Sequence, residues 1–321
     1  MDKKIKVGVV GVGALGNHHA RLYGECDKAE LVGVYDVNKE TANKIAKDYN
    51  TVAFDSMEKL AENTDGVSIA VPTDLHYDIV SLFLDLDTHV LVEKPITHIM
   101  EDARKLVDQA AEKDLILQVG HVERFNPVMT YLNEKIDNPR FIEVHRLAPY
   151  PAPRKNLLPR GTEVGVVLDL MIHDIDLVLH LVNRPIVDVR AVGIPVLSKT
   201  EDIGNARIAF DNGCVANLTA SRVSPELMRK VRVFQGSTYL SLDYMNHTGE
   251  IYGVKGGQIK KEGVPVEKHN ALQKELEDFI HCIADRKVGI ADSVPKVSGE
   301  HGLNALKIAL QITEQIKSQG V

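Results

Sequence analysis

The sequence predicts an α/β protein, with a doubly wound parallel sheet in its amino-terminal part and an α+β domain with a large, open, mainly antiparallel sheet in the rest. Three observations predict this fold class. β-branched runs alternate with helical stretches up to about residue 121, a glycine-rich turn follows the first run, and longer strands joined by hairpin turns come later. Because 321 residues exceed the usual size of one core, we expect two domains, 1–121 and 122–321.

The amino-terminal part contains five β-branched or apolar runs, which we expect to be strands. They lie at 4–10, 30–36, 66–71, 89–92 and 115–119, with helical stretches between them. The stretch after the run 89–92 has a typical helix start, because Thr97 is a candidate cap and Glu101 lies in the first turn, where the helix dipole favours acids. This alternation of strand and helix predicts a parallel sheet.

The carboxy-terminal part has a different pattern. Asp211, Asn212 and Gly213 form a hairpin signal between the runs 206–210 and 214–220. We expect helices at about 166–182, 271–284 and 301–317. The stretch 148–165 is rich in Pro, Arg and Gly, and it is too long and irregular for a simple connection, so we expect a functional loop there.

Composition excludes several classes of protein. The formal net charge is −7, from 38 basic and 45 acidic residues. A chain with this charge does not have the excess of basic residues that nucleic-acid binding requires. The sequence contains no run of about 18 apolar residues, so we expect no membrane-spanning segment. Cys26, Cys214 and Cys282 are too few and too far apart for a disulfide framework. We therefore expect the protein to be located in the reducing cytoplasm.

The turn after the first strand has the pattern G-x-G-x-x-G, formed by Gly11, Val12, Gly13, Ala14, Leu15 and Gly16. The first glycine permits a tight turn, the second lets a pyrophosphate approach the backbone, and the third lets helix and strand pack closely. Asp36 follows 20 residues after Gly16, where a carboxylate can bind ribose hydroxyls. This context predicts a Rossmann dinucleotide-binding domain, with NAD favoured over NADP, although Lys39 lies nearby. The alternative is a glycine-rich turn without a ligand.

Glu93, Lys94 and Pro95 follow the expected strand 89–92, so Lys94 emerges at the carboxyl end of the sheet, where such sheets bind ligands. Proline pushes Lys94 out of the helical region, and an X-Pro bond can also be cis. The backbone therefore aims the ammonium group. The alternative is an exposed lysine paired with Glu93.

The expected helix 166–182 carries two stripes. Its apolar stripe contains Leu168, Met171, Ile172, Ile175, Val178, Leu179 and Val182, and its polar stripe contains Asp169, His173, Asp176 and His180. Carboxylates on both sides of His173 would raise the pKa of its imidazole and keep it titrating near neutral pH, as a proton shuttle requires. The alternative is a solvated helix face with incidental pairs.

These residues resemble the Gfo/Idh/MocA family of oxidoreductases. The resemblance covers nearly the whole chain and implies catalytic roles for Lys94 and His173, with Asp169 assisting His173. It also implies assembly into a homodimer or homotetramer through the open sheet. The cofactor contacts that it implies are Val71, Pro72, Thr73, His76, Glu93, Lys94, Gln118 and His121.

The run 120–127 resembles the members of this family that act as UDP-N-acetylglucosamine 3-dehydrogenases. This likeness, and the cationic side chains around the irregular loop, which suit a diphosphate, point to a substrate site. The expected substrate contacts are Lys94, Arg124, Asn126, Arg154, Arg160, Asp169 and His173. Ordinary surface charge is the alternative for the arginines. The family's frequent run of three glycines before the helix is replaced by Val164, Gly165, Val166 and Val167.

We therefore predict an NAD-dependent oxidoreductase that transfers hydride between the nicotinamide and a secondary alcohol of a sugar, with a nucleotide sugar favoured. A dehydrogenase of a free sugar, an inositol or a dihydrodiol is one alternative. A sensor that binds a dinucleotide or metabolite without catalysis is another. We expect no metal site, because the thirteen histidines lack ligand spacing.

Overall fold

The computed structural model describes residues 4–153, 159, 161–290 and 292–320. The predicted substrate residues Arg154 and Arg160 lie outside these ranges. The chain divides into two compact units: Met1–Val122 with Asn270–Leu303 form the first unit, and Glu123–His269 with Asn304–Val321 form the second. This division differs from 1–121 and 122–321 in that residues 270–303 return to the first unit.

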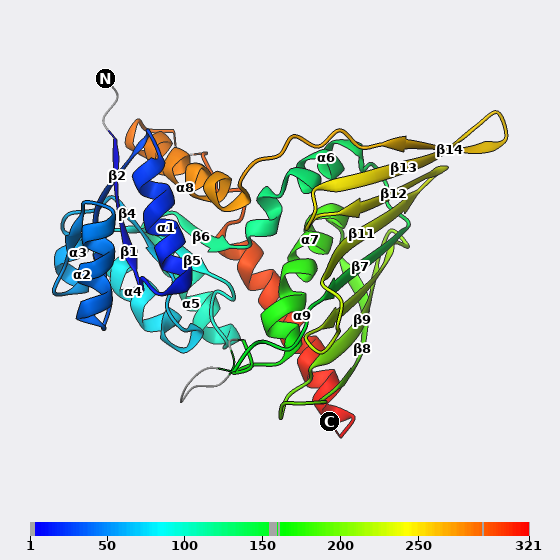
Figure 1. The fold of residues 1–321 in the computed structure, drawn as a ribbon, viewed down its shortest axis with the longest axis horizontal. Coiled ribbons are helices and arrows are strands. Elements are labelled where there is room, and N and C mark those ends of the chain that lie inside the picture. Colours follow the sequence, from blue (N-terminus) through cyan, green and yellow to red (C-terminus); the bar gives the residue numbers. More distant parts are fainter. Residues whose placement is uncertain (1–3, 154–158, 160, 291, 321) are drawn as a thin grey trace. The chain divides into compact units, whose positions relative to one another are not determined.

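The first unit contains a six-stranded sheet in the order β3-β2-β1-β4-β5-β6, and all its strand pairs are parallel (Figure 1). The predicted doubly wound parallel sheet is therefore confirmed. Its strands are β1 (Ile5–Val10), β2 (Ala29–Tyr35), β3 (Val52–Ala53), β4 (Gly66–Ile69), β5 (His89–Glu93) and β6 (Leu117–Gly120). Its helices are α1 (Ala14–Glu25), α2 (Lys39–Asp48), α3 (Met57–Ala61), the 3-10 turn η1 (Thr73–Leu75), α4 (His76–Asp85), α5 (Met100–Glu112) and α8 (Ala271–Lys287).

Helix α8 belongs to the first unit because its apolar face completes that core. Leu276, Phe279 and Ile283 are buried in one cluster with the strand residues Ile5 and Val7. The side chains of Phe279 and Ile283 also lie so close to Gly66 of β4 that a Cβ there would clash with them. Burial of large apolar side chains is the main stabilising contribution in such a core, so α8 is an integral part of this unit.

The second unit contains an eight-stranded sheet in the order β14-β13-β12-β11-β7-β10-β9-β8. Only β7 and β10 pair in parallel, so the predicted mainly antiparallel sheet is confirmed. Its strands are β7 (Phe141–Leu147), β8 (Ile186–Ile194), β9 (Ile203–Phe210), β10 (Val215–Ser221), β11 (Met228–Gln235), β12 (Thr238–Asp243), β13 (Thr248–Lys255) and β14 (Gln258–Gly263). Besides α8, the helical segments described from Val122 onward are the 3-10 turn η2 (Val122–Phe125), α6 (Pro127–Lys135), the π-helical turn η3 (Val167–Met171), α7 (Ile172–Val182) and α9 (Gly299–Ser318).

Some local signals in the sequence predict the structure correctly, and others do not. The predicted hairpin between β9 and β10 is confirmed, and Gly213 in its turn has φ of +79°. Thr97 is not the cap of α5, because the N-cap is Ile99 and the Thr97 hydroxyl instead donates to the Ile99 carbonyl at 2.7 Å. The helix expected from about 166 begins as the π-helical turn η3 and becomes α-helical only at Ile172.

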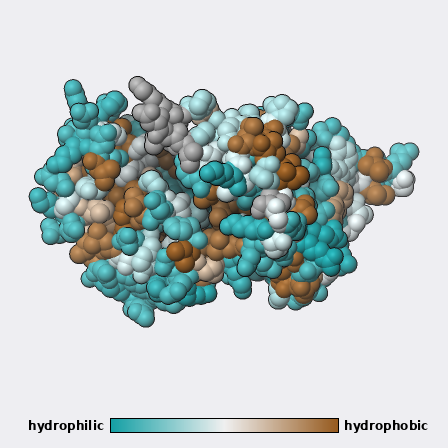
Figure 2. All heavy atoms as spheres, turned by 90° about the horizontal axis from the view of Figure 1, so that it is seen from below, coloured by the Kyte–Doolittle hydropathy of each residue, from teal (hydrophilic) through white to brown (hydrophobic). Residues whose placement is uncertain are grey.

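Hydrophobic side chains on the face drawn in Figure 2 form patches among hydrophilic ones. Scattered exposed apolar residues are normal on a protein surface. In the part of the chain that the structure describes, no helix combines the length and hydropathy needed to cross a membrane.

Candidate active site

The glycine-rich turn after β1 has the geometry of a phosphate cradle. Gly11 has φ of +80°, and a Cβ at Gly16 would lie 1.9 Å from the Gly11 carbonyl oxygen, so neither position accepts a side chain without strain. At Gly13, by contrast, a Cβ would meet nothing within 4 Å. Gly13 is the N-cap of α1, which has no side-chain cap and no acid in its first turn. The start of this helix therefore has free space beside Gly13 and no capping side chain, which suits an anion.

Asp36 lies directly after β2 and contacts the same turn. One carboxylate oxygen accepts the Val12 N–H at 2.9 Å, and the other accepts the Asn38 N–H at 2.8 Å. Each oxygen has two lone pairs, so both retain capacity for a further donor such as a hydroxyl. The carboxylate is thus held beside the cradle in a fixed orientation.

Lys94 is half-buried at the carboxyl end of β5, and its peptide bond to Pro95 is cis. Glu93 contacts His19 of α1, with 3.1 Å between Oε1 and Nε2. His19 is fully buried. The sequence interpretation missed it, although Gly16, His19, Ala20 and Tyr23 form the buried stripe of α1 at helical spacing.

His76 braces two loops at the same edge of the sheet. It is 1% exposed, and its ring nitrogens face the carbonyl oxygens of Pro95 at 2.9 Å and Val71 at 3.1 Å. Burial lowers the pKa of His76, while these carbonyls act in the opposite direction. His76 therefore joins the segment after β4 to the segment after β5, and the cofactor contact that the resemblance implies for it stays a prediction.

The remaining predicted contacts in this unit differ in position. Val71, Pro72 and Thr73 follow β4, and His121 follows β6, so both segments lie at the carboxyl edge with Lys94. Gln118 lies inside β6, is fully buried, and donates to the Glu275 carbonyl of α8 at 3.0 Å. Its side chain thus ties the sheet to α8.

In the second unit, Asp169 lies in the π-helical turn η3, and His173 lies in the first turn of α7. Both side chains are half-buried. π-helical turns inside helices occur frequently at functional sites, because the extra residue redirects side chains. The helix changes from π to α geometry between Asp169 and His173. Their i, i+4 spacing therefore does not place the two side chains as it would in a regular α-helix, which the sequence analysis had assumed.

Asp176, a member of the polar stripe predicted for α7, is only 2% exposed, so the alternative of a solvated helix face is wrong at this position. Asp176 pairs with Arg124, with 3.4 Å between Oδ1 and Nη1, and burial raises the pKa of its carboxyl to about 7 against the attraction of Arg124. Helix α7 is buried around most of its circumference, which a single apolar stripe does not predict.

Asp174 also points inward, into a buried network. Arg146 donates to Asp174 at 2.9–3.2 Å and to Glu123 at 3.2 Å, and Tyr244 donates to Asp174 at 2.8 Å. Asn126 caps α6 through Val128 and donates to Glu123 at 3.1 Å. Arg124, Asn126 and Arg146 are at most 4% exposed, so these members of the run 120–127 and β7 anchor the protein's own helices.

Two family models match the chain. One, described as the oxidoreductase family with an NAD-binding Rossmann fold, matches residues 5–121. The other, described as the Gfo/Idh/MocA C-terminal domain, matches residues 132–257. The fold and the glycine cradle, together with these matches, define an oxidoreductase with an NAD-binding Rossmann domain.

Full-length relatives give the family directly. UDP-N-acetylglucosamine 3-dehydrogenase from Acidithiobacillus ferrooxidans is 36% identical over 323 residues, covering 98% of each chain, and a solved structure of that enzyme has a TM-score of 0.90 and covers 98% of this chain and 99% of its own. The scyllo-inositol 2-dehydrogenase (NAD(+)) of Bacillus subtilis is 27% identical over 92% of this chain and 90% of its own. The protein belongs to the Gfo/Idh/MocA family, and the predicted oxidoreductase is confirmed.

Proposed function

We propose that the protein is an NAD-dependent dehydrogenase of a nucleotide sugar, with UDP-N-acetylglucosamine oxidised or reduced at its 3-position. The observation that carries this proposal is the full-length likeness to an enzyme of that name, at 36% identity. The run 120–127, which resembles that subset of the family, agrees with it, although its polar side chains act internally.

The residues present fit NAD. The open N–H groups at the start of α1, next to Gly13, would hold the pyrophosphate, and Asp36 would accept hydrogen bonds from the adenosine ribose. The negative charge of Asp36 disfavours the 2′-phosphate of NADP. When bound, NAD supplies the hydride acceptor or donor.

We assign three side chains to the reaction. Lys94 would hold the substrate oxygen and stabilise negative charge that develops on it, since a fixed cation acts more strongly on the transition state than on the ground state. His173 would move the hydroxyl proton through Nε2, because its Nδ1 is buried. Asp169 would orient His173. Lys94 and His173 belong to different units, so their action on one substrate is part of the proposal.

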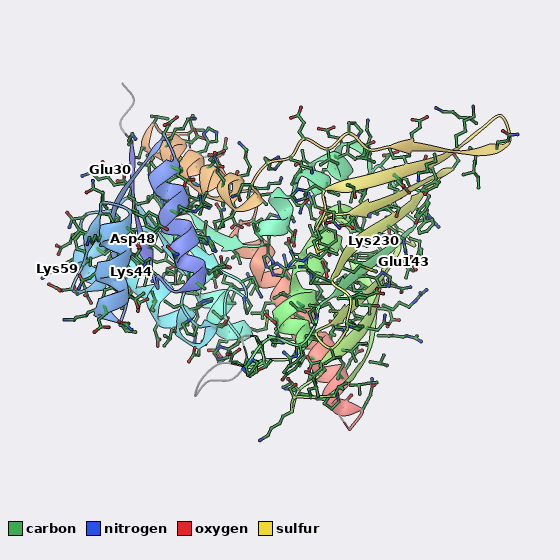
Figure 3. All side chains as sticks on the ribbon, in the orientation of Figure 1. Glu30, Lys44, Asp48, Lys59, Glu143 and Lys230 are labelled. Carbon is green, nitrogen blue, oxygen red and sulfur yellow. The ribbon has the colours of Figure 1, made fainter. Side chains whose placement is uncertain are left out.

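The proposal is tested by NADH formation with UDP-N-acetylglucosamine and by calorimetric binding of NAD. We expect turnover by the wild type, and loss of most turnover in Lys94→Ala and His173→Ala with NAD affinity retained. Lys59→Ala, which removes an exposed lysine from α3 (Figure 3), serves as the control and should be fully active. Undiminished turnover in both active-site variants would remove these assignments. Tighter binding of NADP than NAD would contradict the role of Asp36.

An inositol or other free polyol is the second candidate substrate, favoured by the likeness to scyllo-inositol 2-dehydrogenase. Parallel assays with inositols and glucose would decide between the two. Turnover of a polyol without binding of the nucleotide sugar would support the second candidate. NAD binding without turnover of any of these compounds would instead favour a sensor.

We also propose assembly into a dimer or tetramer through the open face of the eight-stranded sheet. A row of stacked or tilted aromatic rings crosses four strands on this face, with centroids 4.5–5.6 Å apart: Phe141, Phe234, Tyr239 and Tyr252. Glu143 and Lys230 come from adjacent strands on the same face (Figure 3). Light scattering should give twice or four times the chain mass for the wild type and a lower mass for Tyr239→Glu. A monomeric wild type would refute assembly.

The cytoplasm is the proposed compartment, because Cys26, Cys214 and Cys282 are all free thiols. Cys214 and Cys282 are buried, and burial raises the pKa of each thiol to about 11. Cell fractionation checks this proposal, and recovery of the protein outside the cytoplasm would contradict it.

A further inference from the structure

Arg222, directly after β10, uses its whole guanidinium group inside the second unit. It is 2% exposed. Nε donates to Asp202 at 2.8 Å, Nη1 donates to the carbonyls of Gly161 and Val164 at 2.7 and 2.8 Å, and Nη2 donates to the hydroxyls of Ser198 and Thr200 at 2.9 and 3.0 Å. These five bonds match the five N–H donors of arginine.

Asp202 accepts a hydrogen bond from Arg222 and is itself held by the segment Val196–Ser198. One of its oxygens accepts the N–H groups of Val196, Leu197 and Ser198 at 2.6–2.9 Å, and the other accepts the Ser198 hydroxyl at 2.7 Å and Arg222. Burial raises the pKa of Asp202, but these hydrogen bonds outweigh burial and lower it well below its ordinary range. Asp202 is therefore a charged, fixed partner for Arg222.

The segment that Arg222 binds lies against Asp169. Gly161 has φ of +81°, and a Cβ built on it would be 2.3 Å from one carboxylate oxygen of Asp169 and 3.1 Å from the other. The Gly161 backbone therefore touches the carboxylate, and only glycine allows this approach. Because Arg222 binds the carbonyls of both Gly161 and Val164, it fixes this backbone at two points.

We propose that Arg222 is a positioning residue of the active site: anchored on Asp202, it clamps residues 161–164 against Asp169 and so keeps Asp169 in the orientation that His173 requires. The inference rests on the proposed function. The shape of the guanidinium group is essential to it, because the ammonium group of lysine is a compact donor that cannot reach five fixed acceptors at once.

The test compares Arg222→Lys with the wild type in steady-state kinetics. We expect kcat to fall about ten- to hundred-fold, as for a small misplacement of a catalytic group, with the Kd for NAD unchanged. Arg184→Lys is the matched control, since Arg184 forms an exposed ion pair with Asp211 in the same unit, and it should keep full activity. Gly161→Ala leaves the Arg222 and Asp202 side chains intact and should also lower kcat, which covers the case that Arg222→Lys fails to fold.

A double-mutant cycle separates positioning from general stabilisation. If Arg222 acts through Asp169, Arg222→Lys should have little further effect on kcat in an Asp169→Ala background. Equal effects in both backgrounds, or a kcat unchanged in Arg222→Lys, would overturn the inference. Absence of wild-type turnover would overturn the proposed function instead. The clamp would then be tested by hydrogen exchange, which should accelerate at residues 161–169 in Arg222→Lys, and unchanged exchange would refute it.

Discussion

Alanine at position 13 should separate cofactor binding from folding. A Cβ at Gly13 meets nothing within 4 Å, and φ of −66° lies outside the left-handed region. The main cost to stability that we expect is therefore the lower preference of alanine for the N-cap position, about 1 kcal/mol or less in the free energy of unfolding. The methyl group would occupy the open space at the start of α1. Loss of one hydrogen bond to a charged pyrophosphate costs about 1.5–3 kcal/mol, which corresponds to a roughly ten- to hundred-fold higher Kd for NAD.

The assay combines calorimetric titration of NAD with urea denaturation. Gly24→Ala, at an exposed position with open space in the same helix, is the control and should leave the Kd unchanged while stabilising by up to about 1 kcal/mol. Gly16→Ala should instead lower stability by at least about 1–3 kcal/mol, because its Cβ would overlap the Gly11 carbonyl. A folded Gly13→Ala protein that binds NAD as tightly as the wild type would refute the cradle.

Three further predictions concern stability, each measured by urea denaturation followed by circular dichroism. Burial raises the pKa of Asp176 to about 7 in the folded state, so the folded carboxyl binds its proton more tightly than the unfolded one. The stabilisation that comes from this tighter proton binding is present below about pH 4 and is lost as the pH rises to about 7. The difference in the free energy of unfolding between the wild type and Asp176→Asn should therefore fall over this range. A difference that stays constant with pH would contradict the raised pKa. Tyr244→Phe removes a buried hydrogen bond to Asp174 and should cost about 1.5–3 kcal/mol, whereas a neutral effect would argue against the network. Phe279→Ala should cost about 3–5 kcal/mol, and a small loss would mean that α8 is not part of the core.

Most of the fold could be predicted because its signals are local. The rhythm of β-branched runs and helices predicted the parallel sheet, and Asp211, Asn212 and Gly213 predicted a hairpin that the structure contains. The close packing at Gly16 also follows from spacing, since the backbone that it approaches is that of Gly11, only a few residues earlier. The return of residues 270–303 to the first unit could not be predicted, because periodicity shows that a helix has an apolar face but not which sheet it covers.

The candidate site was predicted less completely, because its polar contacts are long-range. Periodicity cannot show that Asp176 faces inward toward Arg124, nor that Glu93 pairs with His19 across 74 positions of sequence. The π-helical turn at Val167–Met171 has no simple signature in residue spacing. Arg124 was predicted to contact the substrate, because a sequence shows the charge of this arginine without showing the carboxylate of Asp176 beside it.

During synthesis, the first unit cannot complete its hydrophobic core until residues 270–303 have been translated. The first 122 residues leave the ribosome without α8, and the whole eight-stranded sheet is translated before Leu276 and Phe279 become available to cover Ile5 and Val7. Domains generally fold in the order of their synthesis, and exposed apolar surface promotes aggregation meanwhile. We therefore expect a recombinant fragment that ends at residue 122 to be insoluble, whereas a chain that includes α8 should be soluble.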